Sequence, residues 1–187
     1  MIIVVSGFRG SGKTLFGKIA KKMKCAVFEM SEPVFALMKE LKMKINNENV
    51  RNFATDFRES GGMDAVAKLI LPKIKSTYQE HKGERNIVII GARCIEEVEI
   101  FRLVDCVLTI AIISDEKIRF ARIKKRGNLS DPDELKNFRW ADQVEVKWGL
   151  KKLVDESEMK IENNRTVEEF VEKVKSILAS KLYHPSK

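Results

Sequence analysis

The fold is decided by the opening stretch of the chain, MIIVVSGFRGSGKTLFGKIAKKM, residues 1–23. Residues 2–6 form a continuous apolar and largely β-branched run, which is typical of a strand buried on both faces of a parallel sheet. Residues 13–23 carry apolar side chains at four-residue spacing, which predicts an amphipathic helix. A loop with three glycines joins the two segments. This order of strand, glycine-rich loop and helix predicts an α/β protein.

The glycine-rich loop, residues 7–14, matches the pattern G-x-x-x-x-G-K-[ST] and is called the P-loop below. Its glycines let successive N–H groups point at phosphate oxygens, and the following helix adds a partial positive charge. Lys13 would reach the β- and γ-phosphates of ATP, and the Thr14 hydroxyl would ligate Mg²⁺. The alternative is a glycine-rich turn beside a solvated lysine. The predicted ATP-binding residues in this segment are Gly7, Arg9, Gly10, Ser11, Gly12, Lys13, Thr14 and Leu15.

The rest of the chain continues the alternation of strands and helices. Further strands are predicted at residues 25–30, 86–92, 106–113 and 158–163. Helices are predicted at residues 33–43, 47–60, 63–81, 95–103 and 115–126, and a last helix is capped by Thr166 with Glu169 three residues on. Pro72 should kink or split the helix that contains it. We therefore expect one domain over residues 1–187, a three-layer α/β/α fold with a five-stranded parallel sheet.

The composition of the chain indicates the charge of its partner and the cellular location of the protein. The 187 residues include 35 Lys plus Arg against 27 Asp plus Glu, a net charge of +8 that suits an anionic partner. Three isolated cysteines without a secretory signal predict reduced thiols and a cytoplasmic location. The longest apolar runs are strand-length, so no membrane span is expected. No pattern indicates an oligomeric state.

A cluster of cations occupies residues 117–126. Its members are Lys117, Arg119, Arg122, Lys124, Lys125 and Arg126. Arg122 and Arg126 are four residues apart and share one face of a helix. Arginines that close over the phosphates stabilise the charge of phosphoryl transfer, so we predict both as catalytic residues together with Lys13. The alternative is a solvated basic helix that binds RNA. Few aromatic residues lie beside these cations, so a nucleic-acid partner is not favoured.

With these motifs in view, the chain resembles the nucleoside monophosphate kinase group. It is most similar to the dephospho-CoA-kinase-like and archaeal adenylate-kinase-related members. The similarity lies in residues 29–40, 50–70, 89–101, 118–127 and 159–174. It implies a helical acceptor-binding region at about residues 32–82 and a short lid at about residues 115–145.

The resemblance also implies roles for individual residues. The implied acceptor-binding residues are Ser31, Glu32, Arg51, Arg58 and Arg93. Arginine can hold a monophosphate through two parallel hydrogen bonds, although each of these arginines could equally be a surface ion-pair residue. The residues implied to lie beside the adenine are Asn163, Asn164 and Thr166. Their alternative role is to form a turn and a helix cap.

Three positions depart from the pattern of that group. Ile90 stands where an acid that helps hold Mg²⁺ is usual, Ala141 where a lid arginine is usual, and Arg9 where a proline is common. Mg²⁺ keeps several waters, so the loss of one outer carboxylate need not abolish its binding. The acids that could compensate are Glu29, Glu32 and Asp56.

These observations predict an ATP-dependent kinase that transfers the γ-phosphoryl group to a nucleoside monophosphate such as AMP, or to a related nucleotide, with Mg²⁺ as cofactor. Two alternatives stay open. One is a dephospho-CoA-kinase-like activity. The other, which Ile90 and Ala141 suggest, is an ATP-binding switch protein with weak ATPase activity and no small-molecule acceptor. The sequence does not identify the acceptor.

Overall fold

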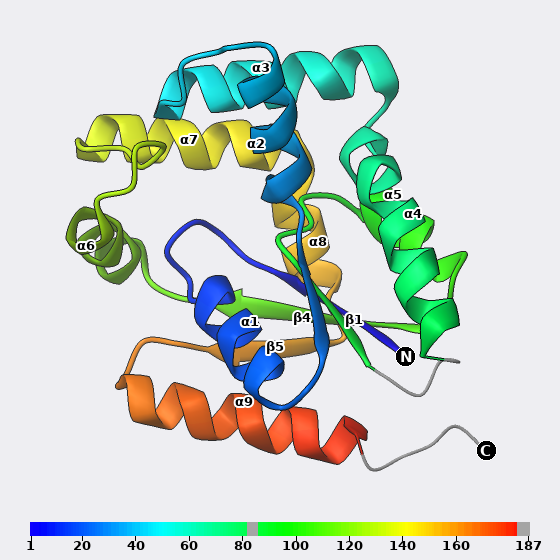
Figure 1. Ribbon diagram of the computed structural model, residues 1–187. Helices are drawn as coiled ribbons and strands as arrows, with labels where there is room; N and C mark the ends of the chain where they lie inside the picture. Colours follow the sequence, from blue (N-terminus) through cyan, green and yellow to red (C-terminus); the bar gives the residue numbers. More distant parts are fainter. Residues whose placement is uncertain (82–85, 183–187) are drawn as a thin grey trace.

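A computed structural model of the protein describes residues 1–81 and 86–182 and contains a five-stranded sheet in the order β2-β3-β1-β4-β5 (Figure 1). Every pair of neighbouring strands is parallel. The strands are β1 (Ile2–Ser6), β2 (Ala26–Glu29), β3 (Ile87–Ile90), β4 (Val107–Ile113) and β5 (Met159–Glu162). The predicted parallel sheet is confirmed, and each strand lies within one or two residues of its predicted bounds.

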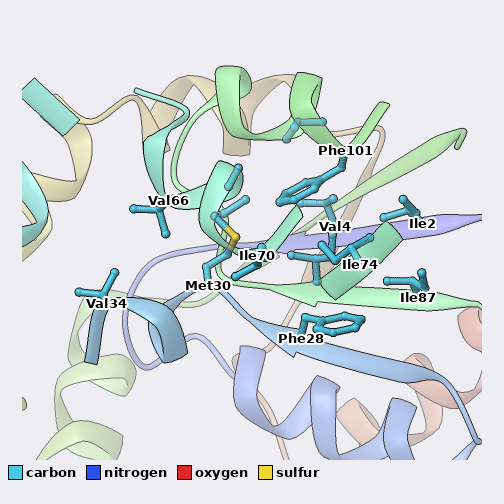
Figure 2. Packing of buried hydrophobic residues seen from close by; sticks show 14 of the residues in the cluster. Ile2, Val4, Phe28, Met30, Val34, Val66, Ile70, Ile74, Ile87 and Phe101 are labelled. Atoms are coloured by element: carbon cyan, nitrogen blue, oxygen red, sulfur yellow. The ribbon is translucent and has the colours of Figure 1, made fainter. Parts of the chain in front are cut away.

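The central strand β1 explains why the opening run is apolar throughout. All five of its residues are buried, because neighbouring strands flank it and helices cover both faces. Ile2 and Val4 pack into the core on one face of the sheet, and Ile3 and Val5 pack into the core on the other. Figure 2 shows the first of these cores, in which Val4 lies close to Phe101.

Helices on both sides of the sheet give the three layers. The first side carries α4 (Ala65–Glu80), α5 (Ile95–Arg102) and α8 (Leu150–Glu156), and the second side carries α1 (Lys13–Lys22) and α9 (Val167–Leu182) (Figure 1). Each helix buries an apolar stripe, such as Ile70 and Ile74 on α4 and Phe170 and Val174 on α9. The arrangement is the three-layer α/β/α fold that the sequence predicted.

Four more helices gather near the carboxyl ends of the strands. They are α2 (Ser31–Glu40), α3 (Asn47–Gly61), α6 (Glu116–Arg126) and α7 (Leu135–Lys147), and α3 lies beside α7 (Figure 1). Ligands of open α/β sheets bind at this end of the strands. The P-loop follows β1 at the same end of the sheet, so a ligand is expected to bind beside it.

Two features of the helices differ from the sequence prediction. No helix was predicted at α7 or α8, and α7 has an unusual inner face, on which the charged Glu145 is buried beside Phe138 and Ala141. A charge on the inner face interrupts the apolar periodicity that predicts a helix. The predicted split at Pro72 is absent, since α4 runs through it as one helix. Pro72 and Lys68, whose carbonyl loses its usual partner, are both exposed to water.

Within residues 1–81 and 86–182, no helix combines the length and the apolar character that a membrane crossing requires.

Candidate active site

The P-loop between β1 and α1 has a backbone that requires glycine. Gly10 and Gly12 have φ angles of 78° and 118°, which side-chain-bearing residues rarely adopt. A Cβ atom at Gly10 would lie 2.6 Å from the carbonyl oxygen of Arg119, and one at Gly12 would lie 2.4 Å from Nδ2 of Asn163. The loop is therefore packed closely between α6 and the connection that leads into α9.

Lys13 lies at the first position of α1 and folds back over the loop. Its ammonium donates hydrogen bonds to the carbonyl oxygens of Phe8, at 3.0 Å, and of Gly7. Burial lowers the pKa of Lys13 well below its ordinary value, and the nearby positive charge of Arg93 lowers it further. The lysine thus occupies the concave side of the loop, where a phosphate group would lie.

A cavity of about 720 Å³ opens over the P-loop. Many of the predicted site residues line it, and they come from the P-loop, α1, the start of α2, the end of β3, α6 and the β5–α9 connection. These residues are Arg9, Gly10, Gly12, Lys13, Thr14, Leu15, Ser31, Arg93, Arg122, Arg126 and Asn163. Glu29, Phe35, Ile90, Gly91 and Val167 line it as well. Cations outnumber acids along its wall, which suits an anionic ligand.

The two predicted lid arginines reach the cavity from α6. Arg122 donates to the Ser114 hydroxyl at 3.2 Å and to the carbonyl oxygen of Asn163 at 3.0 Å. Arg126 donates to Asp131 at 2.8 Å, and Arg9 of the P-loop donates to the other oxygen of the same carboxylate at 3.1 Å. Asp131 therefore connects the P-loop to the lid, and it neutralises two cations that line the cavity.

Arg119 of α6 was counted among the lid cations but was given no role. It donates to Asp142 at 2.8 Å and to the carbonyl oxygen of Arg9 at 3.1 Å. Its guanidinium also lies over the rings of Phe8 and Phe138, at 5.2 and 5.0 Å. Arg119 thus holds the tip of the P-loop against α7. The available signal was its position one turn before the apolar Ile123, on the buried face of α6.

Two of the predicted acceptor-binding arginines, Arg51 and Arg93, converge on a residue that sequence reasoning missed. Arg51 of α3 is 1% exposed, and its Nη2 lies 3.5 Å from Oε1 of Glu145 on α7. Arg93 follows β3, and its Nε lies 3.5 Å from Oε2 of the same carboxylate. Burial would raise the pKa of Glu145, but Arg93 and Arg51 lower it to about 2. Arg93 lines the cavity, while Arg51 and Glu145 lie behind it.

Arg58 occupies a different environment from the other two predicted acceptor arginines. Its Nη2 donates to Oε1 of Glu97 at 2.6 Å, and its guanidinium lies 4.5 Å from the ring centre of Trp148. It does not line the cavity, so its position does not fit the predicted acceptor-binding role. Glu32 likewise lies on the exposed face of α2, outside the cavity wall.

The predicted adenine-side residues hold the β5–α9 connection in place. Asn163 donates its amide to the carbonyl oxygen of Ser11 at 2.7 Å, and Asn164 accepts from the backbone of Asp115 at 2.9 Å. Thr166 accepts from the backbone of Glu169 at 3.2 Å, so the predicted helix cap is confirmed. The side-chain amides of both asparagines are thus engaged within the protein, and Val167 lines the cavity beside Asn163.

Comparison with known proteins identifies the family. A family model described as an AAA domain matches residues 3–170. A UPF0200 protein of Methanosarcina mazei is 33% identical over 97% of this chain and 95% of its own length. The chain belongs to the UPF0200 family. A UPF0200/UPF0201 protein of Archaeoglobus fulgidus is 32% identical over 95% of the chain, which spans only 54% of that relative's length.

Solved structures show that the UPF0200 chain shares its fold with small-molecule kinases. A shikimate kinase from Bacteroides thetaiotaomicron superposes with a TM-score of 0.63, covering 98% of this chain and 99% of its own, at 15% identity. A gluconokinase from Sinorhizobium meliloti has a TM-score of 0.58, covering 97% and 94%, also at 15% identity. At this identity the likeness shows the fold alone, and the predicted kinship with adenylate or dephospho-CoA kinases stays a prediction.

The donor atoms of this UPF0200 protein fit a Mg²⁺ ion that arrives with a nucleotide. Among the described residues, no group of three or more His, Cys, Asp or Glu side chains could hold a metal ion. The Thr14 side chain is exposed on the cavity wall, and Ile90 lines the wall where an acid was expected. Mg²⁺ in kinases is held mainly by phosphate oxygens and water, with few protein ligands. Thr14 is the residue that would hold it here.

Proposed function

We propose that this UPF0200 protein is an ATP-dependent nucleotide kinase that transfers the γ-phosphoryl group of ATP to a nucleoside monophosphate such as AMP, or to a related nucleotide. One observation carries the proposal. Lys13 of the P-loop, Arg122 of the lid and Arg93 of the acceptor side line a single cavity of about 720 Å³. Phosphoryl transfer needs cations around both substrates, and this cavity supplies them.

The donor would bind in the P-loop. Backbone N–H groups of residues 10–13 would surround the β-phosphate, where the N-terminus of α1 adds partial positive charge. Lys13 would exchange its bonds to the carbonyl oxygens of Gly7 and Phe8 for bonds to the β- and γ-phosphates. The hydroxyl of Thr14 would hold the Mg²⁺ that accompanies ATP.

Transfer would proceed by positioning and electrostatics. Arg122 and Arg126 would stabilise the negative charge that spreads over the transferred oxygens, as cations do in this reaction class. Arg93 would hold the anionic group of the acceptor through charge-assisted hydrogen bonds. Glu29 and Ser31 line the same wall and can accept a hydrogen bond from an acceptor hydroxyl. No covalent intermediate is required.

Two alternative functions differ from this proposal in the acceptor: one uses another acceptor, and the other uses none. The first is a dephospho-CoA-kinase-like activity, for which the same cavity would serve. The second is an ATP-binding switch with weak ATPase activity, and two observations favour it: Ile90 on the cavity wall, and Asp131, which already neutralises Arg9 and Arg126. The names of the structural neighbours add shikimate and gluconate to the compounds worth testing.

The test is a phosphoryl-transfer assay. Purified protein is incubated with Mg-ATP and a panel of nucleoside monophosphates, dephospho-CoA, shikimate and gluconate, and the products are read by mass spectrometry. We expect one nucleotide to gain a phosphoryl group, and Lys13→Ala to slow the reaction on the order of 10²–10³-fold, since one stabilising donor is lost. ADP and phosphate without any phosphorylated acceptor would favour the switch. Turnover unchanged by Lys13→Ala would refute the kinase.

A further inference from the structure

Glu145 is a buried carboxylate to which the reaction described above assigns no task. It lies on α7, is 2% exposed, and faces Arg51 of α3 and Arg93 of the β3–α5 connection, each at 3.5 Å. The positive charges of Arg9 and Lys13 also lower its pKa. One buried carboxylate is therefore the shared counter-ion of two arginines that come from separate segments of the chain.

The contacts around Glu145 are loose for a buried ion pair. The matched pair in the same protein, Arg58 with Glu97, is 2.6 Å long, whereas both contacts of Glu145 are 3.5 Å. Charge-assisted hydrogen bonds are usually 2.7–2.9 Å long. Oε2 of Glu145 and Nε of Arg51 also lack a hydrogen-bond partner in the described part of the chain. Both guanidinium groups are thus held near the carboxylate, and Arg93, which lines the cavity, retains donors for another anion.

We propose that Glu145 is a positioning residue: its charge keeps Arg93 and Arg51 together beside the cavity, and an anionic group that binds against Arg93 can take over part of this role. The identification of that anion as the acceptor's phosphate rests on the proposed kinase function. The role of Glu145 itself does not, because it follows from the shared contacts.

The physical reason is charge balance. Two like charges held close together repel one another strongly where water is scarce, and a fixed negative charge between them lowers that cost. A small anion and the Glu145 carboxylate therefore neutralise the same cations. When the charge of Glu145 is removed, a bound anion should stabilise the protein more.

The test is thermal unfolding with inorganic phosphate as the probe. Glu145→Gln keeps the shape of the side chain and removes its charge. We expect the midpoint temperature of the phosphate-free variant to fall, and phosphate to raise it more than in the wild type, because phosphate replaces the missing negative charge. The corresponding gain in phosphate affinity is about tenfold, the size of one charge-assisted interaction.

Two controls locate the effect. Glu97→Gln removes a buried carboxylate whose side-chain partner Arg58 does not line the cavity, and the glutamine oxygen can still accept the hydrogen bond that the backbone N–H of Arg93 donates to Glu97 at 2.6 Å. It should therefore lower the midpoint without enlarging the response to phosphate. Adding Arg93→Gln to Glu145→Gln should abolish the additional rise in midpoint temperature that phosphate causes. That result would show that phosphate acts through Arg93. Equal phosphate responses in the wild type, Glu145→Gln and Glu97→Gln would overturn the proposal and leave Glu145 a packing residue.

The remaining outcomes are also decisive. If Glu145→Gln does not fold in ordinary buffer, it is refolded with phosphate; recovery of folded protein supports the counter-ion role, and failure to recover it contradicts that role. The assay with the acceptor panel is run in parallel. A larger phosphate response in Glu145→Gln without any phosphoryl transfer would refute the kinase proposal and support the role of Glu145. Phosphoryl transfer with equal phosphate responses would support the kinase proposal and refute the role of Glu145.

Discussion

The proposed donor side and the proposed acceptor side of the cavity are built in different ways. The donor side is one contiguous segment, residues 7–14, whose backbone forms the cradle. The acceptor side is assembled from the side chains of Arg51, Arg93 and Glu145, which belong to three elements spread over almost a hundred residues. The first depends on backbone conformation, and the second depends on charge balance. Substitutions should therefore damage the two sides by different mechanisms.

The largest effect is expected from a backbone change on the donor side. Gly12→Ala places a methyl group 2.4 Å from Nδ2 of Asn163 at a φ of 118°, so either the loop or the Asn163 amide that is bonded to it has to move. Displacement of about 1 Å at a catalytic site costs roughly 10²-fold in rate. We expect at least that loss in phosphoryl transfer, and a matching loss of ATP binding by calorimetry.

The matched control for this change is Gly127→Ala. Gly127 also has a left-handed conformation, with φ of 61°, but nothing lies within 4 Å of the added methyl group. It should cost about 1 kcal/mol of stability and leave ATP affinity as it was. Equal losses of ATP affinity in the two variants would show that the close packing around Gly12 does not cause the loss.

An intermediate effect is expected on the acceptor side, and it separates two arginines. Arg93→Gln should raise the KM of the acceptor about 10- to 100-fold, the cost of lost charge-assisted bonds, while the KM of ATP changes little. The comparison is Arg58→Met combined with Glu97→Gln, which removes a buried pair without leaving either charge unpaired. The glutamine keeps an oxygen that can accept from the backbone N–H of Arg93, as Glu97 does. That double variant should change the melting temperature alone. A rise in acceptor KM in the double variant would restore the acceptor role that the sequence predicted for Arg58.

The smallest effect, a change in ATP affinity, is expected at Asp131, which connects the P-loop to the lid. Asp131→Asn removes the carboxylate that holds Arg9 and Arg126. Both cations then become available to phosphate, so ATP should bind more tightly, by less than about tenfold because Arg126 is exposed. Calorimetry at low and high salt measures the change. Weaker ATP binding in this variant would mean that Asp131 stabilises the closed lid and does not compete with phosphate.

The contrast between the two sides also explains what the sequence could predict. The strand, loop and helix of residues 1–23 were predictable because apolar runs, glycines and the lysine each act locally. Arg58 and Arg93 could not be told apart, because the difference lies in their partners, Glu97 for one and the cavity for the other. Glu145 was missed with its helix, since a buried charge breaks the apolar pattern that would have revealed α7.

Lys13 gives the donor side one more property. Its amine is buried near Arg93, so it holds its proton weakly before ATP binds. The negative oxygens of ATP would raise the pKa of Lys13 toward its ordinary value. Between these two pKa values, ATP binding is coupled to proton uptake, and the affinity for ATP falls as the pH rises through that window. At a pH inside that window, nucleotide capture by the proposed kinase would therefore consume a proton.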